Sequence, residues 1–243
     1  MSVSGRLVII AGATSASGLA AARVLRDAGA RVVAVGRDAG RLRDLLDSLE
    51  TVPTSSRRGA PASPLAAAAG SVRTDVCDLG DETAVAALAE RIHATDGPVD
   101  GVLHLVGGWR GGGGLAGQTD ADFRFLEGSL TALRHVSRAF DGDLRASGAG
   151  RLAVVSSTAV ARPLAGAANY AAVKAATEAW ARAVAQGFAK DARDAGRPVA
   201  AASVIFRVKS LDGLEEALAH RFADLWLADA ADINDTIIDL GGA

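Results

Sequence analysis

The chain has few of the residues that indicate a cross-linked or membrane-inserted protein. Its single cysteine, Cys77, excludes an internal disulfide bond. No apolar run approaches the roughly 20 residues that a bilayer-spanning helix needs. The first residues lack the charged segment and the cleavage site of a signal peptide. We therefore expect a cytoplasmic protein that makes no contact with a membrane.

An excess of charge of either sign is also missing. The sequence contains 26 Lys and Arg residues against 28 Asp and Glu residues, so its composition gives no reason to expect binding to nucleic acid or anionic lipid. The four histidines have no spacing that suggests a metal site, and we expect His104 in the core. A small-molecule partner is the remaining expectation.

What the sequence does contain is a regular alternation of two kinds of segment. Short runs rich in Val, Ile and Leu alternate with longer amphipathic, alanine-rich stretches, which predicts a single α/β domain with a doubly wound, seven-stranded parallel sheet flanked by helices. Residues 51–70, rich in Pro, Ser, Ala and Gly, are expected to form a surface loop insertion. Strands are expected at 6–11, 31–36, 71–74, 101–106, 150–156, 199–206 and 236–240, and helices at 17–29, 38–50, 81–95, 119–147, 168–195 and 213–229.

A glycine-containing turn follows the first predicted strand and precedes a helix. Glycine at positions 12 and 18 lets the backbone turn sharply and approach a pyrophosphate, whose negative charge is favoured at a helix N-terminus. The turn departs from the commoner glycine spacing, and a structural turn without a ligand is the alternative interpretation. The residues assigned here to dinucleotide binding are Gly12, Thr14, Ser15, Ala16, Ser17 and Gly18.

The ends of the second and third strands bear on which dinucleotide is bound. Arg37 stands where the adenosine ribose lies in dinucleotide folds, and a guanidinium suits a 2′-phosphate, so NADP(H) is favoured over NAD(H). An inward-turned Asp38 would instead favour a free ribose hydroxyl, whereas an Asp38 that caps a helix would leave Arg37 solvated. After the third strand, Asp75 and Val76 are placed to contact the adenine, although Asp75 could equally cap a helix.

One pair of residues indicates proton-transfer chemistry. Tyr170 is the only tyrosine, and Lys174 follows it at the spacing that places two side chains on one helix face. We expect the ammonium to lower the pKa of the phenol, so that it can exchange a proton near neutral pH. Ser157, at the end of the fifth predicted strand, can offer a hydroxyl to the same substrate oxygen. A surface helix pair and an ordinary strand-end serine are the alternative interpretations.

Together, the glycine turn, Asp75, the strand that leads to Ser157 and the Tyr170-x-x-x-Lys174 pair resemble the short-chain dehydrogenase/reductase family over essentially the whole chain. The resemblance implies a single NAD(P)-binding Rossmann domain over residues 1–243. It also implies an NAD(P)(H)-dependent oxidoreductase that transfers a hydride between the nicotinamide cofactor and a carbonyl or alcohol substrate. In that family Tyr170 would exchange the proton, Ser157 would position the substrate oxygen, and Lys174 would act on Tyr170 and the nicotinamide ribose.

Three segments depart from the family pattern. Residues 104–107 read His-Leu-Val-Gly in place of Asn-Asn-Ala-Gly. Ser129 aligns with the asparagine that completes a catalytic tetrad through a water molecule, and we keep it as a catalytic candidate because a serine could hold that water. The Pro-Gly after the sixth strand is missing, so we expect a short substrate lid or none, and we assign Phe206 to the substrate pocket.

The sequence of residues 106–112, Val-Gly-Gly-Trp-Arg-Gly-Gly, looks like the Gly-Gly-Trp loop of dihydropteridine reductase, an offshoot of the same family. Its small residues would let Val106, Gly107 and Gly108 approach the nicotinamide, and Trp109 would offer a flat wall to a planar substrate. An alternative function is therefore the reduction of a planar heterocycle. A flexible loop with Trp109 packed on the surface is the alternative structural interpretation.

Two further expectations concern function class and assembly. The altered glycine turn and the missing asparagine would also fit a dinucleotide-binding sensor without catalysis, which the retained Tyr170 opposes. The predicted helices 119–147 and 168–195 carry wide apolar stripes, and the equivalent helices of the family pair across a two-fold axis. We therefore expect a homodimer or homotetramer.

Overall fold

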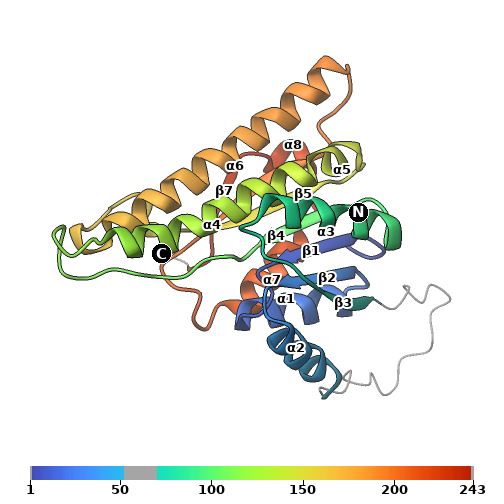
Figure 1. Ribbon diagram of the computed structural model, residues 1–243. Coiled ribbons are helices and arrows are strands. Elements are labelled where there is room, and N and C mark those ends of the chain that lie inside the picture. Colours follow the sequence, from blue (N-terminus) through green and yellow to red (C-terminus); the bar gives the residue numbers. More distant parts are fainter. Residues whose placement is uncertain (1, 52–69, 242–243) are drawn as a thin grey trace.

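A fully parallel sheet forms the centre of the molecule (Figure 1). The computed structural model describes residues 2–51 and 70–241. The strands are β1 (Leu7–Ala11), β2 (Arg31–Gly36), β3 (Ser71–Val76), β4 (Gly101–His104), β5 (Arg151–Ser157), β6 (Ala202–Val208) and β7 (Thr236–Asp239). They lie in the order β3-β2-β1-β4-β5-β6-β7, which confirms the predicted doubly wound α/β fold.

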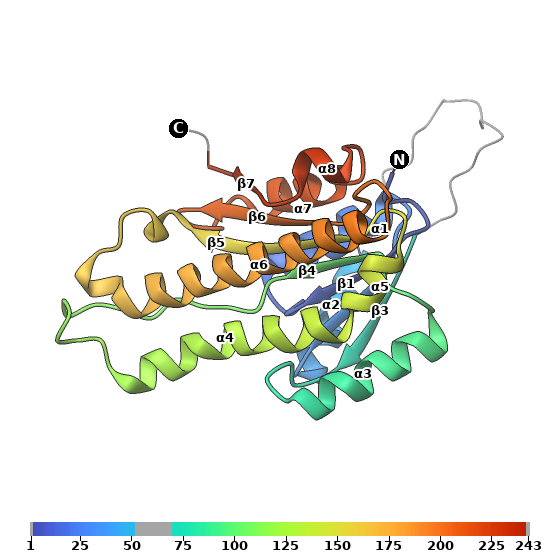
Figure 2. The ribbon, with the colours of Figure 1, turned by 90° about the horizontal axis from the view of Figure 1, so that it is seen from above.

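Helices cover both faces of this sheet (Figure 2). They are α1 (Ala16–Asp27), α2 (Ala39–Thr51), α3 (Glu82–Thr95), α4 (Asp120–Ala139), α5 (Asp141–Ala146), α6 (Ala168–Asp194), α7 (Glu215–Asp224) and α8 (Ala230–Ile233), with short 3-10 helices η1 (Thr158–Val160) and η2 (Ala165–Ala167). One face of the sheet is covered by α1, α2 and α7, and the other face by α3, α4 and α6. Each layer buries its own apolar cluster against the strands, so the core is divided in two by the sheet.

The strand order reverses between β1 and β4. The first strand pairs with β2 on one side and with β4 on the other, so the chain builds the sheet outward in both directions from this point. All residues of β1 and β4 are buried, because helices cover both faces of the sheet. In open parallel sheets, ligands bind outside the carboxyl ends of the strands at such a reversal. The fold therefore predicts where a site should lie.

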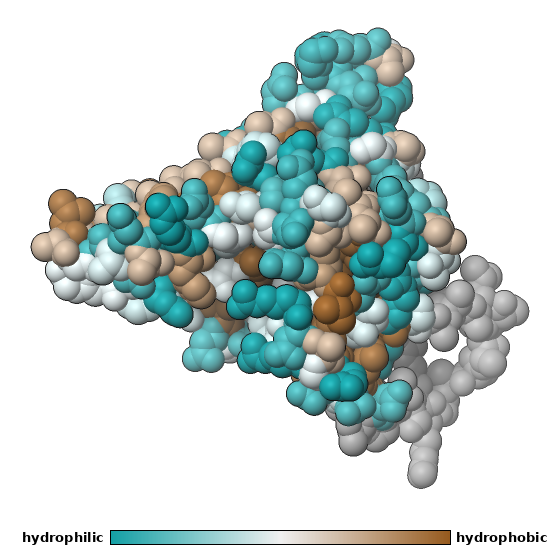
Figure 3. Space-filling model, viewed as in Figure 1, coloured by the Kyte–Doolittle hydropathy of each residue, from teal (hydrophilic) through white to brown (hydrophobic). Residues whose placement is uncertain are grey.

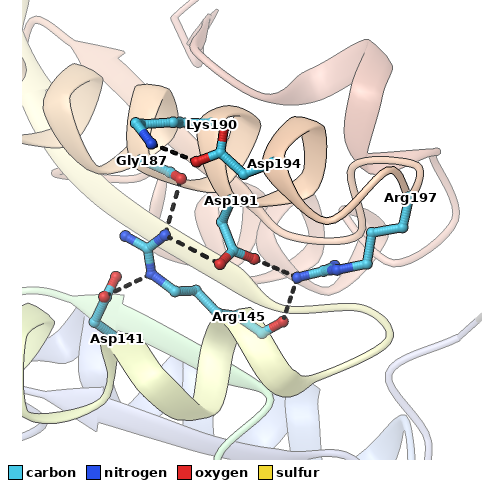
Figure 4. Close-up of polar contacts among 7 residues, drawn as sticks. All are labelled: Asp141, Arg145, Gly187, Lys190, Asp191, Asp194 and Arg197. Atoms are coloured by element: carbon cyan, nitrogen blue, oxygen red, sulfur yellow. Dashed lines mark hydrogen bonds and ion pairs between the residues drawn. The ribbon is translucent and has the colours of Figure 1, made fainter.

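The helix expected at 119–147 is divided at Phe140, a fully buried residue that ends α4 and begins α5. The short α5 is held against α6 by Arg145, which lies 2.6 Å from Asp141 and donates a hydrogen bond of 2.9 Å to the carbonyl oxygen of Gly187 (Figure 4). A Cβ atom at Gly187 would lie 2.8 Å from the guanidinium, so a side chain there would make the end of Arg145 shift. Asp191 completes the cluster by pairing with Arg197 and, at 4.0 Å, with Arg145.

Other boundaries differ from the sequence expectation. The sixth strand continues two residues beyond its predicted end, because the charged Arg207 pairs at 2.9 Å with the buried Glu178 of α6 instead of leaving the sheet. The helix expected at 213–229 is the shorter α7, and α8 was not predicted. The loop insertion expected at 51–70 falls, apart from its two ends, outside the described residues. Within residues 2–51 and 70–241, no helix combines the length and apolar character needed to cross a membrane.

The first turns of α4 and α6 extend beyond the sheet, together with the connections that precede them (Figures 1 and 2). We call these residues, 107–125 and 158–172, the arm. In Figure 3 the arm is the projection on the left, and its surface mixes apolar and weakly polar residues with hydrophilic ones. Of the seven large hydrophobic side chains that are exposed in the described structure, five lie on the arm, and they are Trp109, Leu115, Phe123, Phe125 and Leu164. The arm therefore carries most of the exposed large hydrophobic side chains of the described structure.

Candidate active site

A cavity of about 880 Å³ lies at the carboxyl ends of β1, β4, β5 and β6, at the reversal of strand order. Three of the four predicted catalytic residues, Ser157, Tyr170 and Lys174, line it. The serine ends β5, and the other two lie in the first two turns of α6. Residues 104–109 after β4 and 208–211 after β6 form further walls. Segments far apart in the sequence are thus brought to one place by the parallel topology.

The Tyr170 side chain lies next to both Ser157 and Lys174. The Tyr170 and Ser157 side chains share a hydrogen bond. The Ser157 hydroxyl also accepts a hydrogen bond of 3.2 Å from the backbone N–H of Ala159, which holds the serine side chain at the start of η1. The Lys174 ammonium donates a hydrogen bond of 2.8 Å to the carbonyl oxygen of Val155 and lies 5.8 Å from the centre of the tyrosine ring.

The electrostatics of this trio differ from the sequence expectation. Burial raises the pKa of Tyr170, and the hydrogen bond with Ser157 offsets part of the rise. Burial lowers the pKa of Lys174 to about 8. The expectation that Lys174 lowers the pKa of Tyr170 is therefore wrong for this structure, because the ammonium lies over the ring and burial dominates the phenol. At neutral pH both groups keep their protons.

The predicted phosphate-binding turn lies at the start of α1. Gly12 has a φ of 89°, which L side chains rarely adopt, and a Cβ at this position would lie 2.8 Å from the backbone nitrogen of Val106. Ser15 is the N-cap of α1, and its side chain accepts a hydrogen bond of 3.1 Å from the backbone N–H of Gly18. Ser15 and Ser17 line the main cavity, while Thr14, Ser15 and Ala16 line a second cavity of about 220 Å³ beside α2. The turn therefore separates two cavities.

The second cavity contains a basic residue that sequence reasoning missed. Arg41, in the first turn of α2, lines it together with the turn. Arg37, at the end of β2, is exposed, and it has no hydrogen bond or ion pair to the described residues. Asp38 accepts hydrogen bonds from the backbone N–H groups of Gly40 and Arg41 at 2.9 and 3.1 Å. Asp38 therefore caps α2, which confirms the alternative interpretation of this residue given from the sequence.

Of the two residues expected to contact adenine, Asp75 is paired with arginines and Val76 is exposed. Both carboxylate oxygens of Asp75 accept hydrogen bonds, one from Arg73 at 3.2 Å and one from Arg91 at 2.8 Å. The structure thus gives this carboxylate a partner on β3 and another on α3, instead of a capping role. Val76 has 52% of its surface exposed and follows it at the end of the strand. It remains available to a flat apolar ligand.

The residues assigned to the substrate pocket and to catalysis include two, Phe206 and Ser129, that do not line the main cavity. Phe206 has no exposed surface and packs in the core on the face of the sheet that α1, α2 and α7 cover. Its assignment to the substrate pocket is therefore wrong. The longer β6 moves that wall of the cavity to the residues 208–211. Ser129 is buried in α4, and its hydroxyl donates a hydrogen bond of 2.7 Å to the carbonyl oxygen of Leu126. Because that hydroxyl is used within its own helix and does not line the cavity, it is not placed to hold a catalytic water.

His104 is the residue that contacts the backbone of Ser129. Its Nε2 lies 3.1 Å from the Ser129 carbonyl oxygen, while its Nδ1 is buried and has no partner among the described residues. The ring is 4% exposed and lines the cavity on the side of Lys174. The prediction that His104 is buried in the core is correct, but no sequence pattern indicates that the residue also lines the cavity.

The glycine-rich loop that follows β4 is tied to the segment that carries Tyr170. Val106, Gly107, Gly108 and Trp109 all line the cavity, and Trp109 is 60% exposed. The side-chain amide of Gln118 donates hydrogen bonds of 3.1 Å to the carbonyl oxygens of Gly112 and Gly166, and its oxygen accepts one of 3.1 Å from the backbone N–H of Asn169. Sequence reasoning missed Gln118, because a glutamine after a glycine run carries no local signal.

This fold and cavity define the class of Rossmann oxidoreductases that use a nicotinamide cofactor. Residues 6–192 match the family model described as short chain dehydrogenase, which is more than half of the chain. The chain belongs to the short-chain dehydrogenase/reductase family and is an NAD(P)-dependent oxidoreductase, as the sequence resemblance implied.

Solved structures of the family have the same fold at low sequence identity. A metagenomic short-chain oxidoreductase in complex with NADP has a TM-score of 0.79 at 23% identity, with 100% of both chains covered. L-Sorbose reductase from Gluconobacter frateurii, complexed with NADPH and L-sorbose, has a TM-score of 0.76 at 20% identity, with 100% of this chain and 97% of that chain covered. An NADPH-bound oxidoreductase with an atypical catalytic center, from Pseudomonas aeruginosa PAO1, has a TM-score of 0.77 at 21% identity, with 97% and 95% covered.

The search of curated proteins found no match to this sequence. The family and structure matches do not favour the two alternative functions, namely reduction of a pterin-like heterocycle and binding of a dinucleotide without catalysis.

Proposed function

We propose that this protein interconverts a small-molecule carbonyl compound and its alcohol, with NADP(H) as the cofactor, in the cavity at the carboxyl ends of β1, β4, β5 and β6. The observation that carries the proposal is that Ser157, Tyr170 and Lys174 line one cavity, with Tyr170 next to both of the others, beside the N-terminus of α1. The expected single NAD(P)-binding domain over residues 1–243 is part of the same proposal.

The residues around the turn fit a dinucleotide. The N-terminus of α1 and the cavities on both sides of the turn leave room for a phosphate group. We assign cofactor contacts to this turn, to Val76, to Val106, Gly107 and Gly108, and to Tyr170 and Lys174. When bound, the cofactor supplies or accepts a hydride, and the protein supplies orientation and electrostatics.

Two side chains would handle the substrate oxygen, and Lys174 would bind the cofactor beside them. Tyr170 holds a proton at neutral pH because burial raises its pKa, so it can donate that proton to the oxygen of a carbonyl as the oxygen gains charge. The hydroxyl of Ser157, already within reach of the phenol, positions the same oxygen. Lys174, whose ammonium lies over the phenol ring in the same cavity, would bind the nicotinamide ribose. Trp109 forms one wall for the substrate.

Two guanidinium groups support the choice of NADP(H). Arg37 directly follows β2 and has no partner in the described structure, and Arg41 lines the second cavity together with Thr14 and Ser15. A guanidinium binds a phosphate through charge and paired hydrogen bonds, whereas Asp38, the nearest carboxylate on this segment, is engaged at the start of α2. The structural relatives bound to NADP or NADPH support the same choice.

The proposed assembly is a homodimer or homotetramer formed through α4 and α6. These helices pack side by side on one face of the sheet, and the arm that they share carries five of the seven exposed large hydrophobic side chains. Apolar side chains gathered on one part of a surface favour association.

The test of this function is carbonyl-dependent oxidation of NADPH by the purified protein and by the Tyr170→Phe variant. We expect the variant to lower kcat by roughly 10²–10⁴-fold while NADPH still binds, because the phenol is the proton donor. The matched pair Ser157→Ala and Ser156→Ala supplies a control, since Ser156 contacts Glu178 in the core and does not line the cavity. A parental kcat in Tyr170→Phe, or failure of NADPH to bind the parent protein, would contradict the proposal.

A further inference from the structure

Among the residues that the structure describes, every charged side chain that lines the main cavity is basic. Lys174, Arg162 and Lys209 belong to this lining, and no described Asp or Glu does. The whole chain has slightly more acidic than basic residues, so this one-sided lining does not follow from composition. A concave surface lined by one sign of charge raises the local concentration of molecules with the opposite charge. The cavity therefore selects for anions.

Two of the three cations have no role in holding the fold. Lys174 donates to the carbonyl oxygen of Val155. Arg162 and Lys209 are exposed and make no hydrogen bond or ion pair within the part of the chain that the structure describes. Other arginines of this protein are paired, for example Arg207 with Glu178. The positive charge at the cavity is thus free to bind a ligand.

The position of Arg162 places it at the substrate end of the cavity. It lies between η1 and η2, on the connection from β5 to α6, which also carries Ser157 and Tyr170. The dinucleotide turn follows β1, and β4 stands between β1 and β5 in the sheet. The N-terminus of α1 would bind the negatively charged phosphates of a dinucleotide at that turn. Arg162 is therefore left for the other ligand.

The remaining wall at this end is apolar. Trp109 and Leu164 line the cavity with 60% and 67% of their surfaces exposed, so they present apolar area that a ligand could cover. A guanidinium beside apolar walls recognises a molecule that has an apolar body and an anionic group.

We propose that the substrate is an anionic carbonyl compound or the corresponding alcohol, with an apolar body, and that Arg162 binds its carboxylate or other anionic group. Lys209 adds a second positive charge to the same cavity. This inference rests on the proposed oxidoreductase function, because it deepens the assignment of the same site. The carbonyl group would lie at Ser157 and Tyr170 while the anionic group lies at Arg162, so the distance between them sets the preferred substrate length.

The test uses matched pairs of carbonyl compounds that differ only in charge. Benzoylformate, benzoylpropionate and benzoylbutyrate would be compared with their methyl esters, by NADPH oxidation and by calorimetric binding to the protein loaded with NADP⁺. For at least one chain length we expect the acid to have a KM and a Kd about tenfold lower than the ester, as a charge-assisted hydrogen bond provides. In Arg162→Gln the ratios of ester to acid, in KM and in Kd, should fall from about ten toward one.

Arg221→Gln is the matched control, because Arg221 is exposed on α7, has no partner among the described residues and does not line the cavity. It should keep the parental ratio. Esters that bind and react as well as the acids would overturn the anionic substrate and leave the oxidoreductase function standing. Acids that bind preferentially through Arg162 without any NADPH oxidation would support the anion site and count against the proposed function. An acid preference that survives Arg162→Gln would overturn the role of this residue.

Discussion

The imidazole Nε2 of His104 lies 3.1 Å from the main-chain oxygen of Ser129, and this contact determines the state of the ring. A carbonyl oxygen only accepts hydrogen bonds, so Nε2 carries the proton and donates it. The other nitrogen, Nδ1, then holds a lone pair beside the cavity, buried and without a partner in the described structure. Burial, and after it the charge of Lys174, lower the pKa of His104 to about 4.

The first prediction is that His104 stays neutral throughout the working pH range. A lowered pKa of about 4 means that the ring gains its second proton only in acid, unlike an ordinary histidine near pH 6.5. We expect ring nitrogen NMR signals of a single neutral tautomer, and no histidine-dependent limb in the rate profile between about pH 5 and 7. Comparison with His104→Asn identifies the signals. A titration of the His104 ring in that interval would show that the site is better hydrated than its contacts indicate.

A second pH prediction concerns Lys174. Its pKa is lowered to about 8, so the ammonium is present below that pH and is lost as the pH rises through it, while the raised pKa of Tyr170 keeps the phenol protonated. Carbonyl reduction should therefore proceed at its full rate below about pH 8 and fall above it. The profile of kcat against pH checks this. Lys174→Arg should move the falling limb upward, because a guanidinium keeps its charge, and a limb that stays in place would assign it to another group.

Much of the fold could be predicted because local pattern determines it. An uninterrupted apolar run such as β1 is buried on both sides only when the strand lies between two layers of helices. This is why the sequence pattern predicted all seven strands. The errors lie where a distant partner overrides the local pattern. Arg207 indicates the end of a strand by its charge, yet Glu178 on another element keeps it in β6. Phe140 continues an apolar stripe, yet the contacts of Arg145 with α6 turn the chain there.

The candidate site divides in the same way. Tyr170 and Lys174 could be predicted because their spacing on a helix is itself the signal. Gln118 could not, since its partners Gly166 and Asn169 are about fifty residues away and become neighbours only in the folded chain. The pKa of Tyr170 was predicted with the wrong sign, because the sequence shows the neighbouring charge and does not show the degree of burial.

The third prediction concerns cofactor choice. If Arg37 meets the 2′-phosphate, the protein should bind NADPH more tightly than NADH, and Arg37→Asp should narrow or reverse that difference. Loss of the charge-assisted hydrogen bonds between Arg37 and the 2′-phosphate should raise the Kd for NADPH about tenfold and change the Kd for NADH little. Fluorescence titration of both cofactors measures it. Arg43→Gln is the control, because Arg43 is exposed on the same helix as Arg41 and does not line the second cavity. Equal affinities of the parent for the two cofactors would contradict the assignment.

The fourth prediction separates the structural from the ligand-binding role of the glycine turn. A Cβ at Gly18 would lie 2.0 Å from the carbonyl oxygen of Ala13, so Gly18→Ala must displace the start of α1 and weaken the cap that Ser15 provides. We expect a loss of roughly 2–4 kcal/mol in the free energy of unfolding, measured by urea denaturation without any cofactor.

The matched control is Gly128→Ala in the exposed middle of α4, where nothing lies within 4 Å of the new Cβ. That variant should gain roughly 0.5–1 kcal/mol, because alanine loses less conformational entropy than glycine in a helix. The two substitutions are chemically identical, so opposite signs would isolate the close packing at Ala13 as the cause. An unchanged unfolding midpoint for Gly18→Ala, with NADPH affinity alone reduced, would mean that the backbone tolerates a side chain there and that the glycine serves the phosphate only.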